Sequence, residues 1–386
     1  MRRLRTLSTR RIAAIAVAVA ALVITAGIAQ AELGSEPKPA PKALDRAILD
    51  AANAPAPAGL SARITFTNAL LPAGTMPGGG SSPLLAGAEG RIWLARDGRM
   101  RLELQSERGD AQIISDGDRL TVYDADSETA YTAALPEERE KTADREPATL
   151  ADVRRGLERL AQAWTLSGAQ PTSTGGRPTY TVRISPKDDG GLLGAGELAW
   201  DSEHGVPLRA AIYAQGQSEP VLELEATDVS FGAVSDADLR FTAPEGAKVV
   251  EIDPPAHDPS SGKQEAVSGV EAVQSRLPFR LAAPRELAGL PRKEVRLVRF
   301  DGGAGAISLY GEGLGGIVVL QTPARADGAQ DEGGDRLPQV NIDGATGTEL
   351  ATALGTIVTF ERGGVSYTVA GSVPPVAAEN AARGLR

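Results

Sequence analysis

Two Asp-Gly pairs, each flanked by runs that alternate apolar and polar residues, constrain this chain most. They lie at 97–98 and 116–117, inside the stretch 88–134. Asp-Gly favours a tight hairpin turn because its residues tolerate positive φ angles. The run 99–105 has charged residues on one side and Met100, Leu102 and Leu104 on the other. The stretch is therefore predicted to be an antiparallel meander with one apolar face.

Two-residue turns would also set the strand register. In the first hairpin they pair Ala95 with Met100 and Trp93 with Leu102. In the second they pair Ile113 with Leu120 and Ala111 with Val122. A one-residue slip would move every side chain to the other face, so the register should be strict. The surface predicted to be an apolar groove consists of Trp93, Ala95, Met100, Leu102, Leu104, Leu120 and Val122.

Two segments with helical periodicity are available to cover this surface. Residues 42–52 place apolar side chains at i, i+3, i+4 and i+7. Residues 148–164 carry a similar stripe, and Thr149 with Asp152 resembles a capping box at the start of that helix. The residues predicted to form a lid are Leu44, Ile48, Val153 and Leu157. Further strands are predicted up to residue 252, which closes the first domain.

The N-terminal segment 1–31 has the pattern of a signal peptide or an N-terminal anchor. Five arginines precede the uncharged run Ile12–Ala29, and Ala29-Gln30-Ala31 matches a cleavage site. The remainder is predicted to lie outside the cytoplasm, in the periplasm or cell envelope, either secreted or held by the anchor. Residues 32–41 are a proline-rich linker.

Composition excludes several classes of function. The chain has no Cys and two His, which argues against thiolate or histidine-rich metal sites. The formal net charge is −10, and the five N-terminal arginines contribute +5, so the chain after residue 31 carries −15. A chain this acidic is a poor candidate for binding nucleic acid.

The rest of the chain is predicted to form a second, smaller unit. Residues 253–275 are polar and proline-containing, as linkers between domains usually are. Residues 276–386 are predicted to be a small α+β domain with a hairpin around 362–364 and a closing helix at 376–385.

The chain offers no convergent catalytic or metal-binding set. Gly311, Gly313 and Gly316 match a dinucleotide fingerprint, but a strand follows them where the phosphate site requires a helix. His204 has acidic neighbours, but these are adjacent residues of one predicted exposed turn. The stretch 124–128 lacks the glycine of an EF-hand loop. We therefore predict no catalytic residues, no metal, no cofactor and no enzymatic activity.

Residues 42–252 resemble the LolA-like lipoprotein carriers and the N-terminal domain of MucB/RseB-type sigma-factor regulators. The stretches that carry the resemblance are Gly90–Leu94, Gly98–Glu103, Asp116-Gly117 with Val122–Asp124, Trp200-Asp201 before Gly205–Arg209, and Phe241 before Pro244-Glu245-Gly246. The second domain resembles one found in anti-sigma-type extracytoplasmic proteins, through Arg362–Tyr367.

The resemblance implies an α+β fold: an unclosed antiparallel β-barrel with a helical lid, plus the smaller C-terminal α+β domain. In the carriers such a groove takes up acyl chains. Two interpretations of the apolar face stay open, a lipid-binding groove or a permanent core under the helices. The predicted function is an exported, non-catalytic protein that binds an acyl lipid or a lipoprotein as carrier or sensor. The alternative is an envelope-stress signalling protein that regulates an anti-sigma factor by protein–protein binding.

Overall fold

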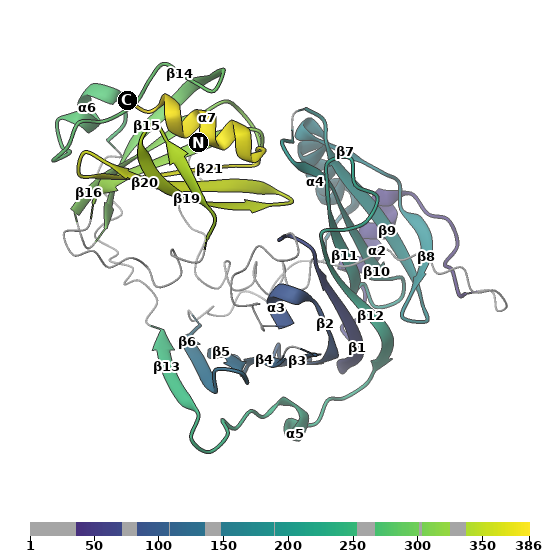
Figure 1. Cartoon of the computed structure of the whole chain (residues 1–386). Helices are drawn as coiled ribbons and strands as arrows, with labels where there is room; N and C mark the ends of the chain where they lie inside the picture. The colour runs from purple at the N-terminus through teal and green to yellow at the C-terminus, as the bar shows by residue number, and fades with distance from the viewer. Residues whose placement is uncertain are drawn as a thin grey trace.

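The computed structural model describes residues 36–71, 83–107, 109–135, 148–188, 190–252, 267–300, 303–324 and 337–386 (Figure 1). The predicted signal segment 1–31 lies outside these residues. Within the described ranges, no helix is both long and apolar enough to cross a membrane. The strands form two sheets, one of thirteen strands and one of eight.

The first sheet runs from β1 to β13, in the order β13-β6-β5-β4-β3-β2-β1-β12-β11-β10-β9-β7, with β8 paired to β9. Its strands are β1 (Gly59–Asn68), β2 (Ala88–Ala95), β3 (Met100–Ser106), β4 (Gly109–Ser115), β5 (Arg119–Asp124), β6 (Thr129–Ala134), β7 (Trp164–Leu166), β8 (Gln170–Thr174), β9 (Arg177–Pro186), β10 (Leu193–Asp201), β11 (Pro207–Ala214), β12 (Leu222–Phe231) and β13 (Lys248–Ile252). Its helices are α2 (Leu44–Ala52), α3 (Pro83–Ala86), α4 (Leu150–Ala163) and α5 (Asp236–Leu239).

This sheet curls without closing, since its end strands β13 and β7 pair with β6 and β9 and not with each other. In Figure 1, β3 to β6 cross the bottom of the view, β1 and β12 rise from one end, and α3 lies in the bend. The predicted unclosed barrel is confirmed. One pair departs from the antiparallel pattern, because β13 runs parallel to β6. The chain crosses from β12 to the far edge through α5, and such a crossover allows parallel pairing.

The first hairpin has a different turn from the predicted one. The Ala95 amide donates to the Arg99 carbonyl (2.9 Å), which leaves a three-residue loop at 96–98. Gly98 has φ +87°, the left-handed residue that commonly ends such loops. The extra residue pairs Ile92 with Leu102 and Trp93 with Arg101. The predicted pairing is wrong, and Trp93 and Ala95 lie on the opposite face from Met100, Leu102 and Leu104.

The second hairpin also differs from prediction, but without changing faces. The Asp116 amide donates to the Arg119 carbonyl (3.2 Å), so the two-residue loop is Gly117-Asp118. Ile113 therefore pairs with Val122 instead of Leu120. A shift of two residues preserves the alternation, and Leu120 and Val122 share a face with Ile113 as predicted.

The two faces of the first sheet are chemically distinct. What we call the apolar face includes Leu60, Ala62, Ile64, Phe66, Ile92, Leu94, Met100, Leu102, Leu104, Ala111, Ile113, Leu120, Val122, Tyr131, Ala133, Tyr180, Val182, Leu198, Trp200, Leu208, Ile212, Leu222 and Leu224. The opposite, polar face includes Arg63, Arg91, Trp93, Arg101, Glu103, Arg183, Glu197, Arg209, Glu223 and Glu225.

The helices cover a different part of the apolar face from the predicted one. Leu44, Ala47 and Ile48 of α2 pack against the aromatic side chains Tyr180 and Trp200 of β9 and β10. Helix α4 packs on α2 and β7, and none of its residues is fully buried. The predicted lid over β2 to β5 is thus wrong in position, because the bulky apolar side chains of β9 and β10 take up α2.

Local contacts tie α4 to α2. The predicted capping box is present, with the Thr149 side chain accepting from the Asp152 amide. Asn53 at the end of α2 exchanges hydrogen bonds with the backbone of Ala148 (both 3.0 Å). Arg154 pairs with Asp45 at 2.8 Å. These contacts hold the two helices as one unit over β7 to β10.

The second sheet has the order β14-β15-β16-β17-β21-β20-β19-β18. Its elements are β14 (Glu286–Leu287), β15 (Leu290–Phe300), β16 (Gly303–Tyr310), β17 (Ile317–Pro323), β18 (Gln339–Ile342), β19 (Ala345–Thr352), β20 (Gly355–Arg362) and β21 (Val365–Gly371), with helices α6 (Val270–Gln274) and α7 (Pro375–Gly384). The three buried alanines of α7 pack into its core. The predicted hairpin at 362–364 and the closing helix are present. Glycines 311, 313 and 316 connect β16 to β17 as a hairpin.

Part of the predicted linker packs against the second sheet. Residues 253–266 lie outside the described ranges, but Val273 of α6 is fully buried with Val295 of β15. The two sheets also touch: the Leu192 amide donates to the Ser372 carbonyl (3.0 Å) and the Ala353 amide to the Leu70 carbonyl (2.7 Å). That they are separable folding units remains a prediction.

The first turn allows a test of why the register shifts. We expect Gly98→Ala to lower the free energy of unfolding by about 1 kcal/mol, because a Cβ is unfavourable at positive φ. Nothing lies within 4 Å of that Cβ, so the effect is purely conformational. Gly232→Ala is the control, since Gly232 is equally open and lacks the positive φ. Urea unfolding measures both, and equal losses would contradict this explanation of the turn.

Candidate ligand-binding face

Three of the predicted groove residues are core residues. Met100, Leu102 and Leu104 are 6%, 3% and 2% exposed. Leu102 and Leu104 pack with Ile64 and Leu224, and Leu84 of α3 lies against this cluster. Leu102 and Leu104 thus lie under α3, and all three residues are too buried to be open to a ligand in this conformation.

The other predicted residues divide between the two faces. Leu120 and Val122 lie on the apolar face and are half-buried. Trp93 and Ala95 lie on the polar face, as the register of β2 and β3 requires. The lid residues Leu44 and Ile48 pack over β9 and β10, while Val153 and Leu157 are half-buried in α4.

The apolar face becomes more exposed toward β13. Helix α2 packs on β9 and β10, and α3 packs on β1, β3 and β4. Beyond them, Tyr131 of β6 is 40% exposed and Ile252 of β13 is 49% exposed. Ala133 lies two residues after Tyr131 on β6, pairs with Ile252, and is half-buried. The described part of the face therefore offers a hydrocarbon surface at the β5–β6–β13 end.

The acidic turn around His204 is a structural cross-link. Asp201 is fully buried, whereas an exposed turn was predicted. Its carboxylate accepts hydrogen bonds from Arg177 Nε (2.8 Å) and from the amides of His204 (2.7 Å) and Glu203 (3.1 Å). His204 Nδ1 lies 3.0 Å from the same carboxylate. Asp201, Glu203 and His204 are the one group within the described ranges with metal-ligand spacing.

Charge balance argues against a cation at this cluster. The Arg177 guanidinium pairs with both Asp201 and Glu203 and so already supplies the positive charge. Burial raises the pKa of Asp201, but the hydrogen bonds from Arg177 and His204 outweigh it and lower the pKa below its usual value. The carboxylate is thus held ionised by protein donors.

The other acidic stretch considered as a cation site, residues 124–128, forms a turn. Asp124 accepts hydrogen bonds from the Asp126 amide (3.1 Å) and from the Ser127 hydroxyl (3.0 Å). These local bonds use the side-chain oxygens to hold the connection between β5 and β6.

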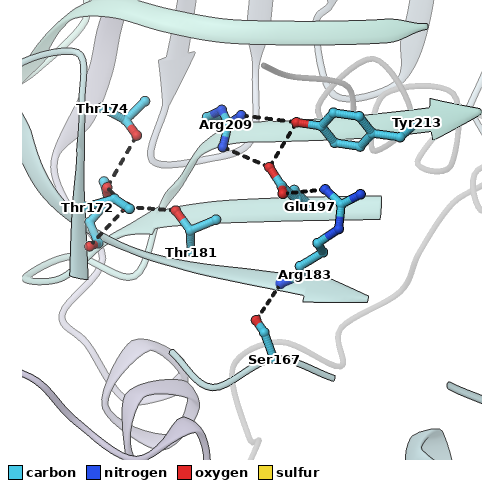
Figure 2. A network of polar contacts seen from close by, with 9 residues as sticks. Ser167, Thr172, Thr174, Thr181, Arg183, Glu197, Arg209 and Tyr213 are labelled. Atoms are coloured by element: carbon cyan, nitrogen blue, oxygen red, sulfur yellow. Dashed lines mark hydrogen bonds and ion pairs between the residues drawn. The ribbon is translucent and has the colours of Figure 1, made fainter. Parts of the chain in front are cut away.

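A polar network on β8 to β11 was not predicted. Glu197 accepts hydrogen bonds from Arg183 (2.7 Å), Arg209 (3.1 Å) and the Tyr213 hydroxyl (3.0 Å), as Figure 2 shows. Burial, and then the nearby Glu197 charge, raise the pKa of Tyr213 to about 12. Beside it, Thr172 forms hydroxyl hydrogen bonds with Thr179 (2.9 Å) and Thr181 (2.7 Å).

This network crosses four strands on the face opposite α2. In the sequence, threonine or arginine occupies every second position in 172–174 and again in 177–183, which is the period of a strand. Pairing between strands far apart in the chain decided which of these side chains meet. Its hydrogen bonds link β8 to β9, and β10 to both β9 and β11.

A half-buried acid lies on β12. Glu223 accepts a hydrogen bond from the Thr67 hydroxyl (3.1 Å), and its other carboxylate oxygen has no hydrogen-bond partner among the described residues. Burial is the main cause that raises the pKa of Glu223 to about 7. Burial also raises the pKa of Glu225, two residues further along the same strand.

No protein-family model matches the chain. In sequence, it is 29% identical over 171 residues to an outer-membrane lipoprotein carrier protein of Alkalilimnicola ehrlichii, covering 44% of this chain and 72% of that protein.

Solved structures similar to the chain include the Pseudomonas aeruginosa MucA/MucB complex, at 16% identity and TM-score 0.42, covering 87% of this chain and 95% of that one. A LolA superfamily protein from Nitrosomonas europaea has 9% identity and TM-score 0.20, covering 52% of this chain and 99% of that one. The proteins to which the chain is similar thus include a lipoprotein carrier in sequence, and MucB-type and LolA-superfamily proteins among solved structures.

Proposed function

We propose that this protein binds the acyl chain of a lipid or lipoprotein on the apolar face of its first sheet, as an exported and non-catalytic carrier or sensor. One observation carries the proposal: the apolar face extends beyond the part that α2 and α3 pack on. At the β5–β6–β13 end it presents Leu120, Val122 and Ala133 half-buried, and Tyr131 40% exposed.

The energetics of this surface suit an alkyl chain. Burial of about ten methylenes at roughly 0.8 kcal/mol each yields on the order of 8 kcal/mol, before the cost of ordering the chain. The core residues Met100, Leu102 and Leu104 would remain buried, so binding needs no exposure of that core. The proposed contact surface is therefore Leu120, Val122, Tyr131 and Ala133, shifted toward the sheet edge from the predicted groove.

The sequence supports an extracytoplasmic location for this activity. The arginine cluster, apolar run and Ala29-Gln30-Ala31 at the N-terminus favour export. The carrier to which the chain is 29% identical is named for transport of outer-membrane lipoproteins. Acyl groups attached to such proteins are the chemistry that the exposed hydrocarbon surface would recognise.

The test uses two adjacent alanines of β6 that point to opposite faces. Ala133 pairs with Leu120 on the apolar face, and Ala134 pairs with Arg119 on the polar face. We expect Ala133→Trp to weaken binding of a fluorescent fatty acid about tenfold or more, because the indole fills the contact surface. Ala134→Trp should bind like the unsubstituted protein. Fluorescence titration measures both, with melting temperatures as the check on folding.

Two outcomes would contradict the proposal. One is the absence of saturable binding of any acyl ligand by the folded protein. The other is an equal loss of binding in both tryptophan variants, since the binding surface would then not be the apolar face.

A second candidate, regulation of an envelope partner such as an anti-sigma factor, is favoured by the edge strand β13. Val249 is 62% exposed and Ile252 is 49% exposed. An edge strand with exposed apolar side chains can accept an extended segment from another protein. Native mass spectrometry of the protein from its own envelope separates the candidates: a bound lipid mass favours the carrier, and a stable protein partner favours the regulator.

A further inference from the structure

A hollow of about 270 Å³ lies on the polar face, opposite the surface proposed for the acyl chain. Its lining residues are Ser61, Ala62, Arg63, Arg91, Trp93, Asp228 and Ser230. Strand register arranges the side chains in two rows across β2, β1 and β12. Arg63 lies between Arg91 and Asp228, and Ser61 lies between Trp93 and Ser230.

The two arginines are directly opposite each other on neighbouring strands and lack protein partners. Neither forms a hydrogen bond or an ion pair with the described residues, although other arginines on the same face do. Arg101 pairs with Glu103 at 2.6 Å, and Arg119 pairs with Glu251 at 2.7 Å. Like charges directly across a strand pair destabilise a sheet. Across the strands the row reads Asp228, Arg63, Arg91 and Glu103. Each arginine thus has a carboxylate on its outer side, but neither arginine forms an ion pair with it.

A bulge marks the same place. The pairing of β1 with β12 shifts between Arg63 and Ile64, so that Thr227 is an extra residue between the partners Ala226 and Asp228. Bulges increase local twist and redirect side chains, and they are frequent beside binding sites. Here the bulge lies at the floor of the hollow, next to Arg63.

We propose that this hollow is a binding site for a phosphate group, held between the Arg63 and Arg91 guanidinium groups. Each guanidinium offers a fork of N–H donors that matches the oxygens of a phosphate. The hydroxyls of Ser61 and Ser230 add neutral donors along the second row. The Trp93 ring supplies a flat apolar wall for the group that carries the phosphate. The Asp228 carboxylate, beyond Arg63 in the row, repels an anion and so favours the Arg91 side of the pair.

The site lies on the opposite face from the acyl surface, has a different charge and shares no residue with it. This proposal is therefore independent of the proposed function. A phosphate could arrive as a free anion or as the headgroup of a phospholipid. Both sources present the same oxygens to the arginine pair, and the experiment distinguishes them.

The test compares three single substitutions of arginine in the full protein. Arg63→Gln and Arg91→Gln each remove one guanidinium from the hollow. Arg96→Gln removes an equal charge from the neighbouring loop at 96–98, where the arginine is exposed. All three positions are at the surface, so no variant should have a lower melting temperature, and removal of one of the two facing arginines should leave it unchanged or raise it. The probes are inorganic phosphate, followed by isothermal titration calorimetry, and phosphatidylglycerol or phosphatidylcholine vesicles, followed by co-sedimentation.

We expect Arg63→Gln and Arg91→Gln each to weaken binding about tenfold or more, because each loses charge-assisted hydrogen bonds. Arg96→Gln should change binding less than twofold. Binding of inorganic phosphate alone assigns a free anion as the ligand. Binding of phosphatidylglycerol vesicles but not phosphatidylcholine vesicles, lost in Arg63→Gln, assigns a lipid headgroup.

The proposal is overturned if the unsubstituted protein binds neither probe, or if Arg96→Gln weakens binding as much as the two hollow variants. The second result would show general charge attraction. Ala133→Trp should leave phosphate binding intact, which makes failure of this site distinguishable from failure of the acyl surface.

Discussion

Replacing Asp201 by Asn is expected to lower the free energy of unfolding by about 3 kcal/mol, because it breaks an ion pair with a buried carboxylate and leaves Arg177 only the exposed Glu203 as its partner. Asp201 is fully buried and Arg177 donates to it at 2.8 Å. An asparagine keeps the size and can accept from the backbone amides, but its NH₂ group cannot accept from the guanidinium. The remaining Arg177 would also lose the charge that holds it near Phe231.

The pH dependence of this loss has a defined sign. The pKa of Asp201 is below its ordinary value of 3.8 because hydrogen bonds from Arg177 and His204 overcome the opposing effect of burial. A depressed pKa stabilises the fold above the unfolded-state pKa, and that contribution disappears as the pH falls through the folded-state pKa. The difference between the two proteins should therefore be largest near pH 7 and shrink in acid.

Glu203→Gln is the matched control, since Glu203 is the other carboxylate paired with Arg177, at 3.1 Å, and its side chain is 70% exposed. An exposed pair contributes little, so this variant should lie within about 0.5 kcal/mol of the unsubstituted protein. Urea unfolding at pH 7 and at pH 3 measures all three proteins. A loss for Asp201→Asn no larger than that of the control would show that the buried pair is not what holds this turn.

The second large effect is a gain of stability. We expect Glu223→Gln to raise the free energy of unfolding at pH 8 by about 1 to 2 kcal/mol, a figure reduced from the full linkage value because the side chain is partly exposed. Burial, the largest cause, raises the pKa of Glu223 from 4.5 to about 7. Ionising it above pH 7 places a charge where one carboxylate oxygen has no partner among the described residues. A neutral glutamine avoids this cost and keeps the acceptor for Thr67.

The sign of this effect is opposite to that at Asp201. With a raised pKa, the folded state binds more protons than the unfolded state between pH 4.5 and about 7. The unsubstituted protein therefore loses stability as the pH rises through this window, and the two proteins should be equally stable only near pH 4, below the unfolded-state pKa. Glu245→Gln is the control, because Glu245 is exposed on the loop before β13 and does not contribute to the pKa shift of Glu223. A gain that is the same at pH 5 and pH 8 would exclude ionisation as its cause.

Alternation along the strands was enough to predict the meander and its chemistry. In 99–105 and 119–124 the period of two separates apolar from charged side chains whatever the partner strand is. The residues Met100, Leu102, Leu104, Leu120 and Val122 were therefore assigned to a common face, which the register confirms. The capping box at Thr149 and the closing helix were predicted for the same reason, since their signals are local.

The turn geometry decided the face of Trp93 and Ala95, and the sequence did not specify it. Asp-Gly is compatible with a two-residue turn and with a three-residue loop that ends in a left-handed glycine. The second possibility, observed at Gly98, adds one residue and reverses the side of every residue on β2. That reversal places Trp93, together with Arg91 of the same strand, on the polar face, in the hollow proposed to bind phosphate.

The sequence by itself determined the strand pattern, the two chemically distinct faces and the acidic charge of this protein. The tertiary structure alone decided that α2 covers β9 and β10, that β13 joins β6 in parallel, and that Asp201 is buried against Arg177. The physical reason is range: alternation and capping depend on neighbours within a few residues, whereas helix docking, edge pairing and burial of a charge depend on competition among surfaces far apart in the chain.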